Sequence, residues 1–232
     1  SVSAPAHADT ITLGPPTNTA PDFGFAYEVP VTFANGDPRN ESGGTSPVDG
    51  TVIEWNVRAN ADVITPRVLR RNELGGSFTG MRSGPPAFGA GLGLISGPYE
   101  VSMPIRAGEL FGVTMEDATG IEIESYTAPG ASALRFNSRL LDGSSAVPNN
   151  TYSNETQAIS ATIRYCEVPA LKGRSPAQAR AALRGADCTP GTVTKAKKRT
   201  KKRRVVSQGH PPGTRISDTE PVSFKVSRKR RK

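Results

Sequence analysis

The sequence predicts two domains: an all-β, sandwich- or jelly-roll-like domain over residues 21–165, and a small α+β domain with one helix and three strands over residues 166–227. Short runs of β-forming residues separated by Gly, Pro and Asn fill the first part, whereas a capped amphipathic helix can be recognised only in the second. The charge also changes abruptly. The first 165 residues contain ten basic and 17 acidic residues, hence −7, and the rest of the chain contains 19 basic and four acidic residues, hence +15.

Both ends of the chain are predicted to lie outside the two domains. Residues 1–20 are expected to form a flexible N-terminus. Within them, Ala6-His7-Ala8 fits the small-residue pattern at which signal peptides are cleaved, with Asp9 as the first mature residue; an ordinary mobile N-terminus is the alternative. Residues 228–232 are expected to form a basic tail. No apolar run reaches the roughly 18–20 residues that span a bilayer, so no membrane span is predicted.

Alternating apolar and polar side chains predict the strands of the first domain. In residues 51–58, Ile53, Trp55 and Val57 fall on one face, which favours a place for Trp55 in the core over a role as a sugar-stacking platform. Turn residues separate about seven to ten such runs, a spacing typical of a β-sandwich or jelly roll. The other predicted strands lie at 25–33, 68–69, 99–105, 110–115, 120–126, 134–140 and 158–165.

One stretch of this domain carries a family resemblance. The motif "DGTVIEWNVRAN…RVLRRN…SFTG…YEVSMPIRAGELFGV", which covers residues 50–113, resembles β-sandwich domains of exported actinobacterial proteins. The resemblance implies the fold and export, and it implies no activity.

The residue types argue against several forms of catalysis. The two histidines, His7 and His210, lie outside the first domain, so a Ser-His-Asp or Cys-His set there would have no base. Carboxylate pairs leave glycoside hydrolysis open. The pairs available are Glu116 with Asp117 and Glu122 with Glu124. The first pair falls in a turn, and the second alternates with isoleucines, which predicts a solvated strand face. Without EF-hand spacing or an acidic repeat, we predict no metal site and no cofactor.

The second domain begins with clear helix signals. Ser175 is the predicted N-cap and Pro176 the first helical residue, Ala179 and Leu183 share one face, and Gly185 lies at the helix end. Three strands are expected to follow, at residues 192–194, 205–207 and 222–227, with a Pro-Pro-Gly turn before the last.

Residues 166–227 resemble a PASTA domain, the small extracellular module of bacterial penicillin-binding proteins and serine/threonine kinases. Glu220 departs from the family pattern, because a turn glycine usually stands before the last strand. The resemblance implies a role at the cell wall, with binding of peptidoglycan fragments or β-lactams in some members and purely structural roles in others. The matching elements are Val168-Pro169, Leu171, Gly173, the Ala179 to Leu183 helix, Cys188, Gly191-Thr192-Val193, Val206-Ser207-Gln208, Pro211-Pro212-Gly213 and Pro221-Val222.

The only two cysteines, Cys166 and Cys188, flank the predicted helix, 22 positions apart. In an exported protein this spacing predicts one disulfide, and variants of the resembled module staple their helix in the same way. Two buried free thiols are the alternative. A zinc site is not expected, because two thiols without a nearby histidine fall short of four ligands.

Eight cations crowd the ten positions from 195 to 204, which we call the basic run. Because like charges repel, the run is expected to form an exposed, mobile hairpin loop that attracts polyanions; a solvated segment without a partner is the alternative. No Tyr or Trp and only Phe224 lie beyond Tyr165, so we expect no sequence-specific nucleic-acid binding. The candidate binding residues are Lys195, Lys197, Lys198, Arg199, Lys201, Lys202, Arg203 and Arg204.

Together these features predict a secreted, non-enzymatic, cell-wall-associated binding or scaffold protein. Its second domain is expected to dock on peptidoglycan or another anionic wall polymer, which leaves the β domain free for a further partner. The alternatives are a charge-driven polyanion or nucleic-acid binding protein and, less favoured, an exported glycan-active enzyme.

Overall fold

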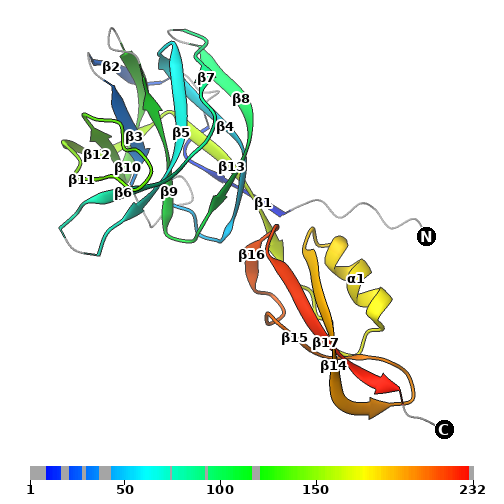
Figure 1. Cartoon of the computed structure of the whole chain (residues 1–232). Coiled ribbons are helices and arrows are strands. Elements are labelled where there is room, and N and C mark those ends of the chain that lie inside the picture. Colours follow the sequence, from blue (N-terminus) through cyan, green and yellow to red (C-terminus); the bar gives the residue numbers. More distant parts are fainter. Residues whose placement is uncertain are drawn as a thin grey trace. The chain divides into compact units, whose positions relative to one another are not determined.

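A computed structural model describes residues 9–16, 21–27, 30–36, 43–73, 75–91, 94–116 and 121–229 (Figure 1). The chain divides into two compact units. The larger comprises residues 11–47 and 52–163, and the smaller is built mainly from residue 164 onward, with residues 48–51. Within the described residues, no helix has the length and apolarity needed to cross a membrane.

The larger unit is all β, as the sequence predicts. A continuous hydrogen-bonded path runs in the order β1-β13-β4-β10-β3-β9-β5-β6-β11, and β2, β7, β8 and β12 pair alongside it. The strands are β1 (Asp9–Leu13), β2 (Phe23–Tyr27), β3 (Val31–Asn35), β4 (Gly50–Asn60), β5 (Val63–Arg71), β6 (Phe78–Ser83), β7 (Ala87–Phe88), β8 (Ile95–Ile105), β9 (Glu109–Met115), β10 (Ile121–Phe136), β11 (Ser145–Ala146), β12 (Asn150–Gln157) and β13 (Ile159–Glu167).

The long strand β10 joins the two faces of this sandwich-like fold. Its first half pairs with β2 and β4, its second half pairs with β3, and its register with β12 shifts between Thr127 and Ser132. The two faces therefore belong to one continuous sheet that folds over a shared core.

Large apolar side chains fill that core. Trp55 is 1% exposed, and its ring centroid lies 4.6 Å from that of Tyr99 and 6.4 Å from that of Phe111. The prediction that Trp55 belongs to the core is confirmed, because a ring enclosed in this way has no face left for a sugar.

Strand β1 lies in the segment that the sequence predicts to be flexible. Leu13 is buried, and β1 pairs with β13. The expectation of flexibility is therefore wrong for residues 9–13, where Ile11 and Leu13 alternate with threonines as in other strands. The cleavage-site motif Ala6-His7-Ala8 lies outside the described residues.

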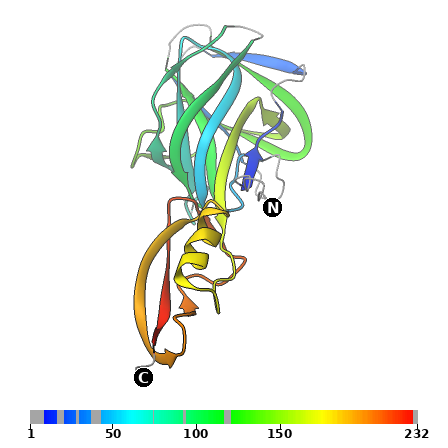
Figure 2. The same cartoon turned by 90° about the vertical axis from the view of Figure 1, so that its right-hand side faces the viewer.

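The smaller unit contains a three-stranded sheet in the order β14-β17-β15, with β17 parallel to β14 and antiparallel to β15. Helix α1 lies against this sheet (Figure 2), and their shared core includes Leu171, Ala179, Leu183, Val222 and Phe224. The elements are α1 (Pro176–Arg184), β14 (Thr189–Thr200), β15 (Val205–Gln208), β16 (Arg215–Ser217), which pairs with β13, and β17 (Pro221–Lys229).

Helix α1 has the predicted ends. Ser175 is the N-cap and its Oγ accepts from the Gln178 N–H at 3.3 Å, while the Gln178 side chain accepts from the Ser175 N–H at 3.0 Å. Gly185 is the C-cap. The Cys166–Cys188 disulfide is confirmed: it ties the end of β13 to the segment after α1, with both cysteines buried.

Candidate functional site

Half of the basic run lies in strand β14 and not in the predicted loop. Lys195, Lys197, Lys198 and Arg199 fall within β14, which pairs with the central strand β17 through register positions such as Thr194↔Lys225 and Lys195↔Val226. The expectation of a loop is therefore wrong for residues 195–200. The described lysines of this stretch are exposed, so water and salt screen their mutual repulsion, and it does not prevent the backbone from pairing.

The four cations outside the strands, residues 201–204, lie on a well-anchored connection. Thr200 Oγ1 lies 2.5 Å from Ser227 Oγ, and Ser227 Oγ accepts from the Arg204 N–H at 3.0 Å. Ser227 N–H donates to the Arg204 carbonyl at 2.8 Å, and Val205 N–H donates to Arg174 at 2.9 Å. Since Ser227 is fully buried, its bonds are shielded from water and hold the connection at both ends.

Four cations converge around a concave pocket of about 380 Å³, which we call the cation pocket. It is lined by Lys195 from β14, Arg203 from the connection, and Arg228 and Lys229 from the end of β17. The last two residues belong to the segment that the sequence assigns to a basic tail. They join the site because β17 continues through Lys229 and pairs with β14, with Arg199 opposite Arg228 and Thr200 opposite Lys229. No local pattern points to them, because the alternation of Val222, Phe224 and Val226 breaks at the buried Ser227.

Three acidic residues of this unit, Glu167, Asp218 and Glu220, have partners outside the pocket. Glu167 pairs with Arg215 at 3.7 Å, and Glu220 lies 3.2 Å from His210 Nε2. The Asp218 carboxylate accepts from Arg164 at 2.7 Å and from the Thr51 hydroxyl at 2.6 Å. Among the side chains that the structure describes, no carboxylate lies within ion-pair distance of the cation pocket.

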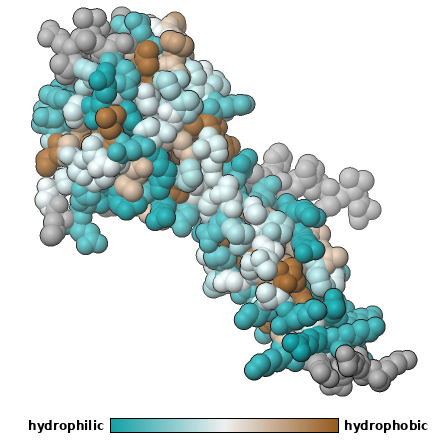
Figure 3. Space-filling view, viewed as in Figure 1, coloured by the Kyte–Doolittle hydropathy of each residue, from teal (hydrophilic) through white to brown (hydrophobic). Residues whose placement is uncertain are grey.

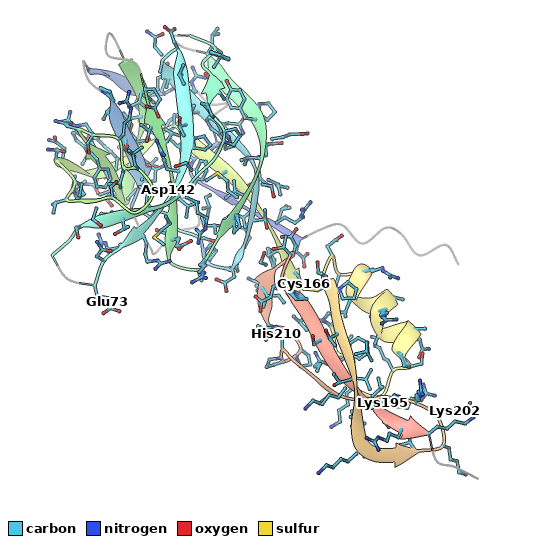
Figure 4. All side chains as sticks on the ribbon, in the orientation of Figure 1. Glu73, Asp142, Cys166, Lys195, Lys202 and His210 are labelled. Atoms are coloured by element: carbon cyan, nitrogen blue, oxygen red, sulfur yellow. A yellow bond between two sulfur atoms is a disulfide. The ribbon has the colours of Figure 1, made fainter. Side chains whose placement is uncertain are left out.

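Strand β17 separates the two kinds of charge. Glu220 directly precedes the strand and Arg228 lies near its end, a separation of about 26 Å at the usual rise of a strand. Lys195 and Lys202 lie toward one end of the unit, with Cys166 and His210 toward the other (Figure 4). Hydrophilic side chains gather at the lysine end (Figure 3). The unit is therefore strongly polarised, with its positive charge at one end.

A second concavity, also of about 380 Å³, lies on the sheet and is rich in hydroxyl groups; we call it the hydroxyl groove. Ser223 Oγ accepts from the Thr192 N–H there at 3.0 Å. The Gln208 side chain is already committed, since it accepts from Leu171 and donates to Pro169 and His210. The hydroxyl groove therefore offers mainly uncharged hydrogen-bonding groups, and Lys225 is the one charged residue among those that line it. Its lining residues are Thr192, Thr194, Ser207, Gln208, Gly209, Ser223, Phe224 and Lys225.

The candidate catalytic carboxylates of the larger unit have arginine partners. Glu116 pairs with Arg67 at 3.3 Å and also with Arg139. Glu124 is 7% exposed and pairs with Arg58, so the prediction of a solvated strand face is wrong for Glu124. Ile123 faces the core on one side of β10, and the Arg58 side chain from β4 covers the other. Asp117 and the Glu122 side chain lie outside the described part of the chain.

Arginine side chains already engage both carboxylates, Glu116 through Arg67 and Arg139, and Glu124 through Arg58. Glu116 and Glu124 therefore fit ion-pairing roles better than proton transfer. In the described part of the chain, no three His, Cys, Asp or Glu side chains lie close enough together to hold a metal ion.

Comparison with known proteins identifies the smaller unit. Residues 167–228 match the family model described as PASTA domain, which confirms the resemblance seen in the sequence. No curated protein and no solved structure matches the chain. The match ends within β17, so it includes Lys195, Arg203 and Arg228 of the cation pocket.

Proposed function

We propose, from the premise that residues 167–228 form a PASTA domain, that this chain is a secreted binding or scaffold protein that attaches to the cell wall through that domain. PASTA is a binding domain with no catalytic activity of its own. The Cys166–Cys188 disulfide supports export, because disulfides persist in oxidising compartments and are rare where thiols are kept reduced.

The observation that carries the proposal is the uncompensated positive charge at one end of the domain. Lysines and arginines of the basic run meet no carboxylate among the described side chains, whereas Glu167, Asp218 and Glu220 of the same unit pair elsewhere. Exposed cations of this density attract an anionic polymer and release its counterions on contact. Peptidoglycan and the anionic polymers attached to it are the ligands that this charge and this domain favour.

The hydroxyl groove supports the same proposal by a different chemistry. Its serine and threonine hydroxyls offer uncharged hydrogen bonds of the kind that sugar hydroxyls and amides accept and donate. A wall polymer carries charged groups and neutral sugar or amide groups. The basic run would bind the charged groups, and the hydroxyl groove would bind the neutral ones.

Co-sedimentation of the full chain with insoluble cell-wall material tests the proposal. The wild type is expected to sediment with the wall at low salt, and a variant with all eight cations of the basic run changed to Gln is expected to stay in solution. A control variant removes three exposed cations on or just before helix α1, Lys172→Gln, Arg180→Gln and Arg184→Gln, and is expected to sediment like the wild type. Equal sedimentation of the eight-residue variant and the wild type would contradict the proposal.

A further inference from the structure

We infer that the cation pocket of Lys195, Arg203, Arg228 and Lys229 is a binding site for the phosphate groups of a phosphodiester-linked wall polymer. The other lysines of the basic run then contribute long-range attraction without direct contact. This inference rests on the proposed function and deepens it, because it names the chemical class of the ligand and separates contact residues from the rest of the run.

The first argument is the convergence of the pocket's side chains. They come from three segments, and two of them are arginines, whose planar guanidinium groups match phosphate oxygens with two parallel hydrogen bonds. The lysines add compact positive charges beside the same anionic groups. By contrast, the exposed Lys197, Lys198, Lys201 and Lys202 line neither this pocket nor the hydroxyl groove.

The second argument is the strand register, which places like charges together. Arg199 lies directly opposite Arg228, which lines the cation pocket. Like charges opposite each other on neighbouring strands are destabilising. Five arginines of the larger unit have carboxylate partners: Arg58, Arg67, Arg70, Arg82 and Arg139 each pair with Glu109, Glu116 or Glu124. In the larger unit, carboxylates compensate the positive charge of these arginines. In the cation pocket, a bound anion would compensate the positive charge in the same way.

The third argument is that the pocket is held in place before any ligand binds. Ser227, buried next to Arg228 in the sequence, bonds the Arg204 backbone and the Thr200 hydroxyl. Thr200 Oγ1 also donates to the Lys202 carbonyl at 2.5 Å. These bonds fix the backbone on both sides of Arg203, so binding orders side chains only, which reduces the entropic cost.

Phosphate fits this pocket better than carboxylate or nucleic acid does. A phosphodiester and a carboxylate each carry one negative charge on two oxygens, so compensation of four neighbouring cations takes several anionic groups held close together. A phosphodiester polymer presents a phosphate, which stays ionised, in every repeat unit. Nucleic acid shares that backbone, but its bases need aromatic platforms, and Phe224, the one Phe, Tyr or Trp after Tyr165, is 2% exposed.

The test compares two variants of the full chain with equal net charge. The pocket variant carries Lys195→Gln, Arg203→Gln, Arg228→Gln and Lys229→Gln. The matched variant carries Lys197→Gln, Lys198→Gln, Lys201→Gln and Lys202→Gln. Calorimetric titrations use three soluble probes of equal charge: a poly(glycerol phosphate) oligomer, a polyglutamate and an oligothymidine.

The wild type is expected to bind the glycerol phosphate oligomer at least about tenfold more tightly than polyglutamate, the value of one charge-assisted hydrogen bond. The pocket variant is expected to lose this preference. The matched variant is expected to keep the preference while binding every probe more weakly. Equal losses in the two variants, or equal affinity of the wild type for the two non-nucleic probes, would overturn the inference. Tightest binding of oligothymidine would assign the pocket to nucleic acid instead.

A third variant, Thr200→Val, changes no charge. It removes the hydroxyl that bonds Ser227 and is expected to reduce the preference for phosphate, with an unchanged dependence of affinity on salt. An unchanged preference in a folded Thr200→Val chain would contradict the claim that the pocket is preorganised. Wall sedimentation of the same variants distinguishes the phosphate-binding inference from the proposed wall attachment. Wall binding that survives equally in the pocket variant and the matched variant would contradict the phosphate-binding inference and leave the proposed wall attachment intact.

Discussion

At the scale of single residues, the larger unit buries carboxylates by surrounding them with arginines. Glu109 is 2% exposed, and its carboxylate accepts from Arg70 at 2.9 Å, from Arg82 at 2.8 Å and from the Arg106 N–H at 2.9 Å. Burial is the largest influence on the Glu109 pKa and raises it, but the hydrogen bonds from Arg82, Arg70 and Arg106 together lower the pKa below its ordinary value of 4.5.

Replacing Glu109 by Gln is expected to lower the free energy of unfolding by about 3 kcal/mol, because the arginines lose the charge that compensates them. Urea denaturation at neutral pH measures this change. Glu73→Gln is the matched control: Glu73 is exposed, so its substitution is expected to change the free energy of unfolding by less than about 0.5 kcal/mol. Similar losses in both variants would contradict a structural role for the Glu109 cluster.

The stability difference between the wild type and Glu109→Gln is also expected to depend on pH. Since folding depresses the Glu109 pKa, the stability it contributes is full above 4.5 and is lost as pH falls through the folded-state pKa. The difference in unfolding free energy between the wild type and Glu109→Gln is therefore expected to be constant above that pH and to shrink below it. A difference that persists unchanged to about pH 3 would show that the ionised carboxylate is not its source.

At the scale of elements, the disulfide adds stability to a unit whose hydrophobic core is small. It closes a loop across α1, with 22 positions between Cys166 and Cys188. Changing both cysteines to Ala is expected to lower the free energy of unfolding by about 3 kcal/mol, mainly because the unfolded chain gains freedom. Denaturation with and without a reductant measures it: the wild type shifts on reduction and the double variant does not. A wild type whose midpoint is insensitive to reduction would contradict this account.

The elements differ in how well the sequence predicts them. Helix α1 is predicted to its ends, because Ser175, Pro176 and Gly185 act locally. Strand β12 is missed: half of its residues are exposed and its sequence is almost entirely polar, so it lacks the apolar alternation that marks a strand. The extension of β14 into the basic run is missed because it depends on pairing with β17, about 30 positions later along the chain.

At the scale of the whole molecule, charge composition predicts the division of the chain and only part of the candidate site. Of the four residues that line the cation pocket, Lys195 and Arg203 belong to the predicted set, whereas Arg228 and Lys229 are assigned to a tail. The missing information is the parallel pairing of β14 with β17, which no local pattern contains. A run of cations in sequence thus indicates the kind of partner, and the sheet register decides which of those cations converge.

The central claim is that the PASTA domain attaches the chain to an anionic wall polymer through these cations. The most direct test measures the affinity of the full chain for insoluble wall material, with its anionic polymer attached, over a salt series. If four cations contact single-stranded phosphates, affinity is expected to fall about 50-fold between roughly 50 and 200 mM salt, and the pocket variant is expected to lose most of this dependence. Wall binding that does not change with salt, or that is as steep in the pocket variant as in the wild type, would contradict the account.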